Sequence, residues 1–352
     1  MTSARTAVIV TPPPGRYDGG VERHVAMVSA ALQTHGWRFC GVGPRRDHMS
    51  PWLRRLGLTP LLTARDAGSA ARGRGAALVI SNGSLGWGGP RGVPHIHVFH
   101  GTMPAHVWRG EAHRVLRDRV RGAVAGGAAE ALSAAGATKV AVAEQVAREV
   151  RWCLAQRVDE VIPLGVDLER FRPRDWVKAR RRLGLPADER LVLYVGRAEA
   201  RKGGDLLEAV CTAAGARLVI AGDAQDAGGI HLGQLDHDEL PWAYAAADAV
   251  LFPCRYEGFG YVSLEALACQ RPLVATPTGW AADLPSRLPG FAPFVVAPEL
   301  DALAAALSRA LAGGQDAVLE HAAAIVRAEH RAQDFAARWV ALAERVAGGG
   351  PG

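Results

Sequence analysis

The sequence of 352 residues has little cysteine, no long apolar run and no lysine among its first 122 residues. Its five cysteines form no Cys-x-x-Cys pair and no His/Cys cluster with metal-ligand spacing, so we expect reduced thiols rather than disulfides or a zinc site. The first apolar run covers only residues 7–10, too short for a signal-peptide core, and no later run reaches transmembrane length. We therefore expect a cytoplasmic protein.

Positive charge is concentrated at the start of the chain. Residues 1–122 contain 17 arginines and 6 acidic residues, whereas the remaining residues contain 24 basic and 29 acidic ones. Such an asymmetry between halves indicates an anionic partner for the first half. An arginine-rich, solvated surface explains the same composition, and the sequence leaves both explanations open.

Short, β-branched apolar runs recur along the chain and are separated by stretches of helical pattern. This alternation is typical of βα units, and it predicts an α/β protein with parallel sheets. The predicted strands cover residues 7–11, 77–81, 95–100, 139–143, 160–164, 191–195, 217–221, 249–253 and 272–276.

Two prolines, Pro163 and Pro173, enclose a stretch without a clean period, which is the best candidate for a domain boundary. A second joint precedes a final helix predicted over residues 332–346. We expect two Rossmann-like, doubly wound domains, residues 1–165 and 172–331, with the segment 332–352 crossing back onto the first. If the two domains face each other, the carboxyl ends of both sheets line one cleft, where ligands of such sheets bind.

The motif with the most chemical content is RYEGFGYVSLE at residues 255–265, between a predicted strand and a predicted helix. Gly258 and Gly260 let the backbone turn tightly and approach a ligand. The N-terminus of the following helix directs N–H groups and a partial positive charge at the same place, which suits a phosphate. Glu257 and Glu265 can then reach two hydroxylated parts of one ligand.

A second motif, YVGRAEARKGG at residues 194–204, also follows a predicted strand. Arg197 offers a bidentate fork for phosphate oxygens, and Lys202 offers a mobile point charge. A solvated basic loop is the alternative interpretation of this motif alone. Its combination with the Glu257 loop favours a diphosphate site.

Together with GGVERHV at residues 19–25 and VIPLGVDLERFRP at 161–173, these motifs resemble the family 4 glycosyltransferases. The resemblance runs from Gly19 to about Thr276 and includes the Glu-x7-Glu signature at Glu257 and Glu265. It implies the GT-B fold and retaining transfer of a hexose-like unit from a nucleoside diphosphate sugar, with UDP or GDP as the expected nucleotide. The acceptor would be a small molecule, a glycan or a lipid-linked compound. No cofactor, no metal and no nucleic acid are implied.

The resemblance also implies roles for individual donor-binding residues. Arg197 and Lys202 would bind the donor diphosphate, and Glu265 the ribose hydroxyls. Glu257, with the backbone of Phe259 and Gly260, would hold the donor sugar.

Further roles follow for residues outside these two motifs. His100 resembles the histidine that lies beside the sugar, so that the implied catalytic set is His100, Glu257, Arg197 and Lys202. Gly19 and Gly20 would let the backbone approach the phosphate and the acceptor, and Leu235 falls where the base is usually bound.

The densest run of arginines, between residues 109 and 121, is assigned to the acceptor side. At helical spacing Arg114, Arg117 and Arg121 would share one face, because residues three and four apart are neighbours on a helix. Such a face would contact an anionic acceptor, or the inner face of a membrane through peripheral association. An ordinary solvated helix is the alternative.

The sequence departs from the family pattern at several positions. Leu164 stands where asparagine is common, Ala143 where serine is usual, and Gln270 where glycine is usual. Gly279-Trp280 stands where the family frequently has a Gly-Gly pair that faces the donor. This departure affects the expected identity of the sugar and the base, but it leaves the expected diphosphate site unchanged.

Two sequence motifs resemble metal-binding sites. Asp236-His237-Asp238 immediately precedes a helix predicted over residues 239–247, where aspartate is a common N-cap. His95, His97 and His100 are expected on one face of a strand, but the neighbouring strands offer no fourth ligand.

Two other functions compete with that of a glycosyltransferase. A protein that binds sugar nucleotides without catalysis is the main alternative, and the presence of Glu257, Arg197 and His100 argues against it. A nicotinamide-dependent oxidoreductase would need Gly-x-Gly-x-x-Gly after the first strand, and residues 12–15 read Pro-Pro-Pro-Gly.

Overall fold

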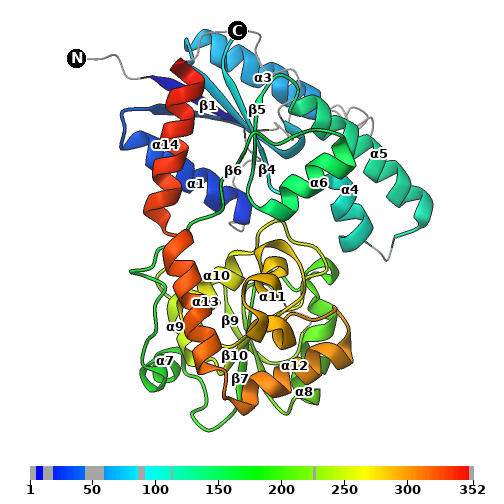
Figure 1. Ribbon diagram of the computed structural model, residues 1–352, viewed down its shortest axis with the longest axis vertical. Coiled ribbons are helices and arrows are strands. Elements are labelled where there is room, and N and C mark those ends of the chain that lie inside the picture. The colour runs from blue at the N-terminus through cyan, green and yellow to red at the C-terminus, as the bar shows by residue number, and fades with distance from the viewer. Residues whose placement is uncertain are drawn as a thin grey trace. The chain divides into compact units, whose positions relative to one another are not determined.

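The computed structural model describes residues 5–10, 19–43, 59–85, 92–111, 114–224 and 227–348, so that residues 12–15 lie outside the described part. The chain divides into two compact units (Figure 1). Unit 1 comprises Met1–Trp108, His113–Leu164 and Gln333–Gly352, and unit 2 comprises Arg109–Ala112 and Gly165–Ala332.

Unit 1 is built on a parallel sheet of six strands among its described residues, in the order β2-β1-β3-β4-β5-β6. The order in which successive strands are added reverses between β1 and β3. These two strands are adjacent in the sheet although β2 lies between them in the sequence. The strands are β1 (Thr6–Val10), β2 (Arg38–Val42), β3 (Leu78–Asn82), β4 (His95–Phe99), β5 (Thr138–Ala141) and β6 (Glu160–Val161).

The helices of unit 1 connect these strands, as the βα alternation predicts, and the last one comes from the end of the chain. They are α1 (Gly20–Gln33), α3 (Thr59–Gly73), η2 (Gly83–Leu85), α4 (Met103–Ala105), η3 (His106–Gly110), α5 (Leu116–Ser133), α6 (Glu144–Leu154) and α14 (Ala332–Gly348).

Helix α14 packs onto unit 1 from a distance of about three hundred residues along the chain. Phe335 and Trp339 lie against the ring of His24 on α1, with centroid distances of 5.6 and 5.3 Å. The indole N–H of Trp37 donates to Glu344 at 3.0 Å. The expected C-terminal crossover helix is therefore confirmed, and Figure 1 shows α14 beside α1.

Unit 2 is built on a second parallel sheet, in the order β11-β10-β7-β8-β9. The order in which successive strands are added reverses between β7 and β10, which are adjacent in this sheet. The strands are β7 (Leu191–Val195), β8 (Arg217–Ala221), β9 (Ile230–Gly233), β10 (Ala249–Phe252) and β11 (Leu273–Ala275). Two parallel α/β units are the predicted fold class, which is thereby confirmed.

The helices of unit 2 include three short 3-10 segments close to the carboxyl edge of the sheet. In chain order the helices are α7 (Trp176–Leu183), η4 (Ala200–Lys202), η5 (Gly204–Leu206), α8 (Leu207–Ala213), α9 (Leu240–Ala246), α10 (Tyr261–Ala268), η6 (Gly279–Asp283), α11 (Leu284–Arg287), η7 (Pro289–Phe294), α12 (Leu300–Ala312) and α13 (Asp316–Glu329). Among the described residues, no helix combines the length and the apolar character needed to cross a bilayer.

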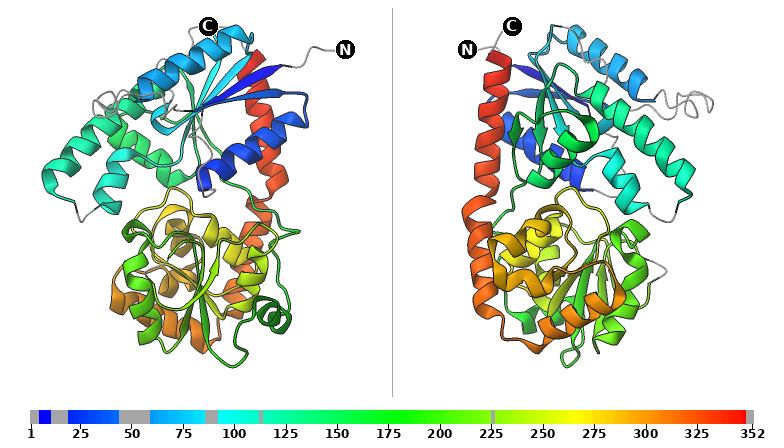
Figure 2. Two further views of the ribbon diagram at one scale, coloured as in Figure 1. Left: turned by 180° about the vertical axis from the view of Figure 1, so that it is seen from behind. Right: turned by 45° about the vertical axis from the view of Figure 1, so that its right-hand side comes forward.

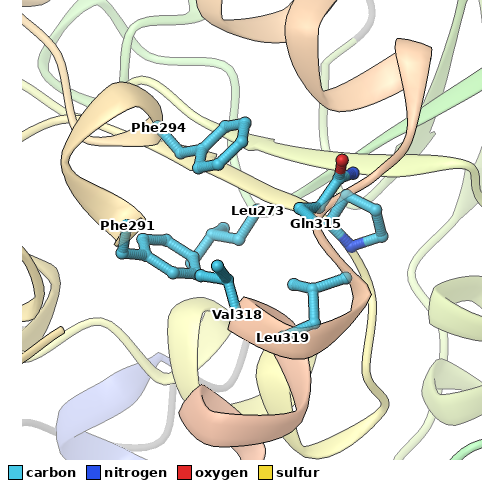
Figure 3. Close-up of a pocket in the computed structure, with 7 residues that line it drawn as sticks. Leu273, Phe291, Phe294, Gln315, Val318 and Leu319 are labelled. Atoms are coloured by element: carbon cyan, nitrogen blue, oxygen red, sulfur yellow. The ribbon is translucent and has the colours of Figure 1, made fainter. Parts of the chain in front are cut away.

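A small apolar gap lies at the amino end of β11 (Figure 3). Phe291, Phe294, Val318 and Leu319 surround Leu273 there, and the space between them admits no water molecule. Because functional groups are expected at the opposite, carboxyl edge of the sheet, we assign this gap to core packing rather than to ligand binding.

Candidate functional site

The two motifs that suggest a diphosphate site follow neighbouring strands of unit 2. The first comes after β7 and the second after β10, and these strands pair directly through Val192 with Ala249 and Leu193 with Val250. They lie on either side of the point where the strand order of the sheet reverses. The carboxyl ends of strands at such a point form the usual ligand crevice of an open α/β sheet.

Lys202 and Glu257 meet across the two loops. The Lys202 ammonium donates to Glu257 Oε2, and the two side chains are only 23% and 21% exposed. Burial would lower the pKa of Lys202, but the Glu257 carboxylate raises it above its ordinary value. Burial would raise the pKa of Glu257, but Lys202 holds it below its ordinary value. Both groups are therefore charged at neutral pH.

Backbone and side-chain hydrogen bonds join these loops into one structure. The Arg255 N–H donates to the Arg201 carbonyl at 2.9 Å, and Arg201 Nη1 donates to the Tyr256 carbonyl at 3.2 Å. The Arg255 guanidinium binds both carboxylate oxygens of Asp205, one of them at 2.7 Å. A bidentate pair of this kind fixes orientation as well as distance.

Two glycines are required by the closeness of the backbones. A Cβ on Gly203, which has a φ of +75°, would lie 2.2 Å from the Pro253 carbonyl oxygen. A Cβ on Gly279, with a φ of +56°, would lie 2.2 Å from that of Phe259. No side chain fits at either distance, so glycine at these positions lets the Lys202 segment and the Trp280 segment rest on the 253–260 loop.

Arg197 lies on the β7 loop but has a different partner. Its Nη1 is 2.8 Å from Glu199, and both side chains are about half exposed. The buried Tyr194 holds the backbone here, because its hydroxyl donates to the Arg197 carbonyl at 2.7 Å. An exposed ion pair contributes little, so the guanidinium can exchange Glu199 for a stronger anion at small cost.

Phe259 and Gly260 lie at the start of α10. Gly260, the N-cap residue, has a φ of +87°, and the Phe259 carbonyl accepts a hydrogen bond from Trp280 N at 2.8 Å. The Phe259 side chain is buried, with its ring 5.9 Å from that of His330. The Phe259 ring therefore belongs to the core, and the role of the Phe259 and Gly260 backbone in holding the donor sugar stays a prediction.

Neither Glu265 nor Leu235 takes part in the contact between Lys202 and Glu257. Glu265 is 1% exposed and accepts a hydrogen bond from the Tyr244 hydroxyl at 2.7 Å. Leu235 is half-buried in the connection after β9. Their assignment to the ribose and the base stays a prediction.

In unit 1, His100 directly follows β4 and contacts the end of β3. Its Nε2 lies 2.9 Å from Asn82 Oδ1, while Asn82 Nδ2 donates to the Val10 carbonyl at the end of β1 at 3.0 Å. Burial lowers the pKa of His100 to about 4, so the ring is neutral at pH 7. This network lies where the strand order of the unit 1 sheet reverses.

His24 is a neighbour of His100 that the sequence did not single out. The two rings meet edge to face with centroids 4.7 Å apart, and His24 is 1% exposed. Burial, with a smaller effect of His100, lowers the pKa of His24 well below its ordinary value. The sequence signal that could have identified His24 is its position in the GGVERHV motif. Gly19 is the N-cap of α1 and Gly20 its first residue.

The predicted arginine face needs a correction. Helix α5 begins at Leu116, and Val115 before it has the extended angles φ −59° and ψ 139°. Arg114 therefore precedes the helix and does not share a face with Arg117 and Arg121. All three side chains are exposed.

The two features that imitate metal sites have other partners. Ser81 Oγ lies 2.7 Å from His95 Nε2 and 2.8 Å from His97 Nδ1, whereas His100 lies beyond the strand and contacts Asn82, so the three histidines do not form one face. Asp236 Oδ1 accepts the backbone N–H groups of Asp238 and Glu239 in the turn before α9, but the N-cap residue of α9 is Glu239, so the aspartates do not cap this helix as expected. No cluster of three or more possible ligands for a metal ion occurs in the described ranges.

Comparison with known proteins shows which family and which folds the chain resembles. Residues 189–313 match the model of the family described as glycosyl transferases group 1. A curated relative, the D-inositol 3-phosphate glycosyltransferase of Segniliparus rotundus, is 39% identical over 147 residues, which cover 35% of this chain and 32% of the relative. The matched part thus spans about a third of that relative's length.

Solved structures match over nearly the whole chain. The sucrose-phosphate synthase of Thermosynechococcus elongatus has a TM-score of 0.78 at 23% identity and covers 97% of this chain and 99% of its own. The Anabaena protein HepE in complex with UDP-glucose has a TM-score of 0.69 at 17% identity and covers 97% of this chain and 99% of its own. The resemblance to glycosyltransferases is therefore confirmed for residues 189–313, and the GT-B type of fold for both units.

Proposed function

We propose that this protein is a retaining glycosyltransferase that moves a hexose-like unit from a nucleoside diphosphate sugar, UDP or GDP being the expected nucleotide. The main support is the contact of Lys202 with Glu257 at the carboxyl ends of adjacent strands. One cationic and one anionic group side by side suit a ligand that joins a diphosphate to a sugar. Unit 2 binds the donor in this proposal, and unit 1 serves the acceptor, which is a small molecule, a glycan or a lipid-linked compound.

Stabilisation of the leaving group is the main chemical task of the site. Cleavage of the sugar–phosphate bond places negative charge on the diphosphate. Arg197, Lys202 and the N-terminus of α10 supply fixed positive charge for it, so that the chain's own residues suffice without a metal ion. The ammonium of Lys202 has three N–H donors, and the contact with Glu257 occupies one of them.

Glu257 and His100 serve the sugar and the acceptor in this proposal. Glu257 stays ionised because Lys202 holds its pKa down, so it accepts hydrogen bonds from sugar hydroxyls. His100 stays neutral and offers its imidazole and backbone carbonyl. We propose front-side attack, in which an oxygen of the departing phosphate accepts the proton of the acceptor hydroxyl.

The first test is a binding experiment. A nucleoside diphosphate that binds only the folded protein raises its melting temperature, so a panel of UDP, GDP and ADP identifies the nucleotide. We expect one of the three to raise the melting temperature clearly more than the other two. If none stabilises the protein, the proposed donor site is wrong.

The second test is turnover of the corresponding nucleotide sugar, measured as release of the free nucleotide. Arg197→Ala and Lys202→Ala should each lower the rate on the order of 10²–10³-fold, the typical cost of one lost charge-stabilising donor. Arg217→Ala removes an arginine from the opposite edge of the same sheet, where it pairs with Glu189, and is the matched control. Wild-type rates in Lys202→Ala with saturating donor would contradict its role.

Two further outcomes separate the remaining alternatives. Activity should persist in excess EDTA, and loss of activity that manganese restores would contradict the metal-independent mechanism. Binding of a nucleoside diphosphate without any turnover would favour the sugar-nucleotide-binding protein. The anomeric configuration of the product, measured by NMR, tests retention.

A further inference from the structure

The first half of helix α5 presents an apolar stripe to solvent. Leu116, Val120 and Val124 are spaced four residues apart and so lie along one side of the helix. They are 62%, 46% and 69% exposed, and Val115 before them is 70% exposed. Single exposed aliphatic residues are ordinary, but a continuous row of them indicates an interaction surface.

Arginines border this stripe. Arg117 lies three residues before Val120, and Arg121 three before Val124, so each arginine is a neighbour of the stripe on the helix surface. Arg114 precedes the helix. Residues 114–124 contain four arginines and a single acidic residue, Asp118. The surface is therefore both apolar and strongly cationic.

A tryptophan lies at the same end of the helix. Trp108 is 44% exposed, and the guanidinium of Arg119 lies 4.4 Å from its ring centroid. Arg119 Nη2 also donates to the Trp108 carbonyl at 2.8 Å. Tryptophan and arginine both combine an apolar body with a polar end, which suits them to the boundary between lipid and water.

The second half of the helix is packed closely against unit 1. Ala123 and Gly127 are buried, and a Cβ on Gly127 would lie 2.9 Å from the ring of Pro104. A Cβ on Gly126 would lie 2.7 Å from Met103. The close packing of α5 on α4 therefore fixes the exposed stripe before any partner arrives, so little ordering cost remains for binding. Figure 2 shows α5 along the outside of unit 1.

We propose that this α5 surface, made of Leu116, Val120, Val124, Arg117 and Arg121, docks on an anionic lipid bilayer. Aliphatic side chains enter the boundary between headgroups and acyl chains, and the arginines contact lipid phosphates. Three aliphatic side chains in a row favour lipid over nucleic acid, which would leave them in water. The arginines favour it over a purely apolar protein partner. The proposal concerns where the protein acts and does not depend on the proposed reaction.

The test is co-sedimentation with vesicles of phosphatidylglycerol and phosphatidylcholine. The triple variant Leu116→Ser/Val120→Ser/Val124→Ser should weaken vesicle binding about tenfold or more at every salt concentration, because apolar burial is insensitive to salt. Arg117→Gln/Arg121→Gln should weaken it mainly at low salt and reduce its salt dependence. Vesicles of phosphatidylcholine alone should bind weakly.

Matched controls separate docking from folding. Val177→Ser/Arg181→Gln changes an exposed valine and an exposed arginine on α7 of unit 2 and should bind vesicles like the wild type. All variants should keep the wild-type circular dichroism and the wild-type melting temperature. Trp108 should shift its fluorescence to shorter wavelength with vesicles, and Trp108→Phe identifies its share of the signal.

Two results would overturn the proposal. Equal binding of the triple variant and the wild type to phosphatidylglycerol vesicles would exclude the α5 surface as the docking site. Concentration-dependent self-association of the wild type, abolished in the triple variant while vesicle binding is unchanged, would assign the surface to a second copy of this chain.

Discussion

The amide of Asn82 determines which nitrogen of His100 carries the proton. Asn82 Nδ2 donates to the Val10 carbonyl, so the Oδ1 atom that faces His100 can only accept a hydrogen bond. His100 Nε2 must therefore be the protonated nitrogen of the neutral ring, and Nδ1 carries the lone pair. Strands β1 and β3 thus set the hydrogen-bonding character of a residue that follows β4.

Replacement of Asn82 by aspartate should change the protonation of His100. A carboxylate next to Nε2 stabilises the imidazolium, so in Asn82→Asp the pKa of His100 should rise by about 1–3 units from its value of about 4. NMR titration of the histidine ring resonances measures this. Ser81→Ala is the control, since Ser81 contacts His95 and His97 instead of His100, and an equal shift in that variant would contradict the assignment.

The Lys202–Glu257 pair should show strong energetic coupling. Each side chain is about four-fifths buried, so removal of one partner leaves a poorly solvated charge. Lys202→Met and Glu257→Gln should each lower the free energy of unfolding by about 1–3 kcal/mol, and the double variant by clearly less than the sum. Urea denaturation of the four proteins completes the cycle, and additive effects would mean that the two groups do not interact.

Glu130 should make stability fall as the pH rises. It is 4% exposed on α5, and burial raises its pKa from 4.5 to about 8, with Met103 N–H opposing and Glu149 adding to the effect. The folded state therefore binds a proton between about pH 4.5 and 8 that the unfolded state releases. Its contribution to stability is present below pH 4.5 and is lost as the pH rises through 8.

The variant Glu130→Gln removes this titration. Relative to wild type, its free energy of unfolding should increase by a few kcal/mol between pH 5 and about 8, because only the wild type must ionise a buried carboxyl. Asp118→Asn, on the exposed side of the same helix, should show no comparable trend. A pH-independent difference between Glu130→Gln and wild type would refute the predicted ionisation of Glu130.

Gln270 is a residue where a glycine would stabilise the protein. Helix α10 ends in a Schellman motif, with Gln270 N donating to the Leu267 carbonyl and Arg271 N to the Ala266 carbonyl. The motif places Gln270 at a φ of +52°, which costs a residue with a Cβ roughly 1 kcal/mol. Gln270→Gly should therefore raise the free energy of unfolding by about 0.5–1 kcal/mol, part of the gain being offset by unfolded-chain entropy.

The control for this effect is Gln270→Ala, which keeps a Cβ in the same conformation. It should leave the denaturation midpoint close to that of the wild type. A stabilisation by alanine as large as that by glycine would show that the loss of the glutamine side chain, rather than the backbone angle, is responsible. The family's usual glycine at this position has the same physical explanation.

The sequence predicted every interior strand of the two described sheets and two of their four edge strands, and it missed the other two edge strands. All nine predicted strands are present, but β2 and β9 lie at the edges of their sheets and were not recognised. Interior strands of a parallel sheet are buried on both faces and form continuous apolar runs. By contrast, β2 contains Gly41 and an exposed Arg38, and β9 contains an exposed His231, so neither has such a run.

The sequence identified the loops of the candidate site but not the contacts within it. Arg197, Lys202 and Glu257 could be predicted because cations, acids and glycines follow apolar runs. The pairing of Lys202 with Glu257 depends on β10 lying next to β7, and strand order cannot be read from local pattern. For the same reason the packing of His24 against His100, from α1 and from the end of β4, was not predicted.

Trp280 belongs to a cluster of three rings, and this packing limits which side chains position 280 can accept. Its ring lies 5.1 Å from His330, and His330 lies 5.9 Å from Phe259, whose backbone supports the Gly279 turn. Replacement of Trp280 by glycine would remove the ring that packs against the buried His330 and leave a cavity beside it. Residues 280 and 330 should therefore vary together among close homologues, so that a small residue at 280 is accompanied by a bulkier one at 330.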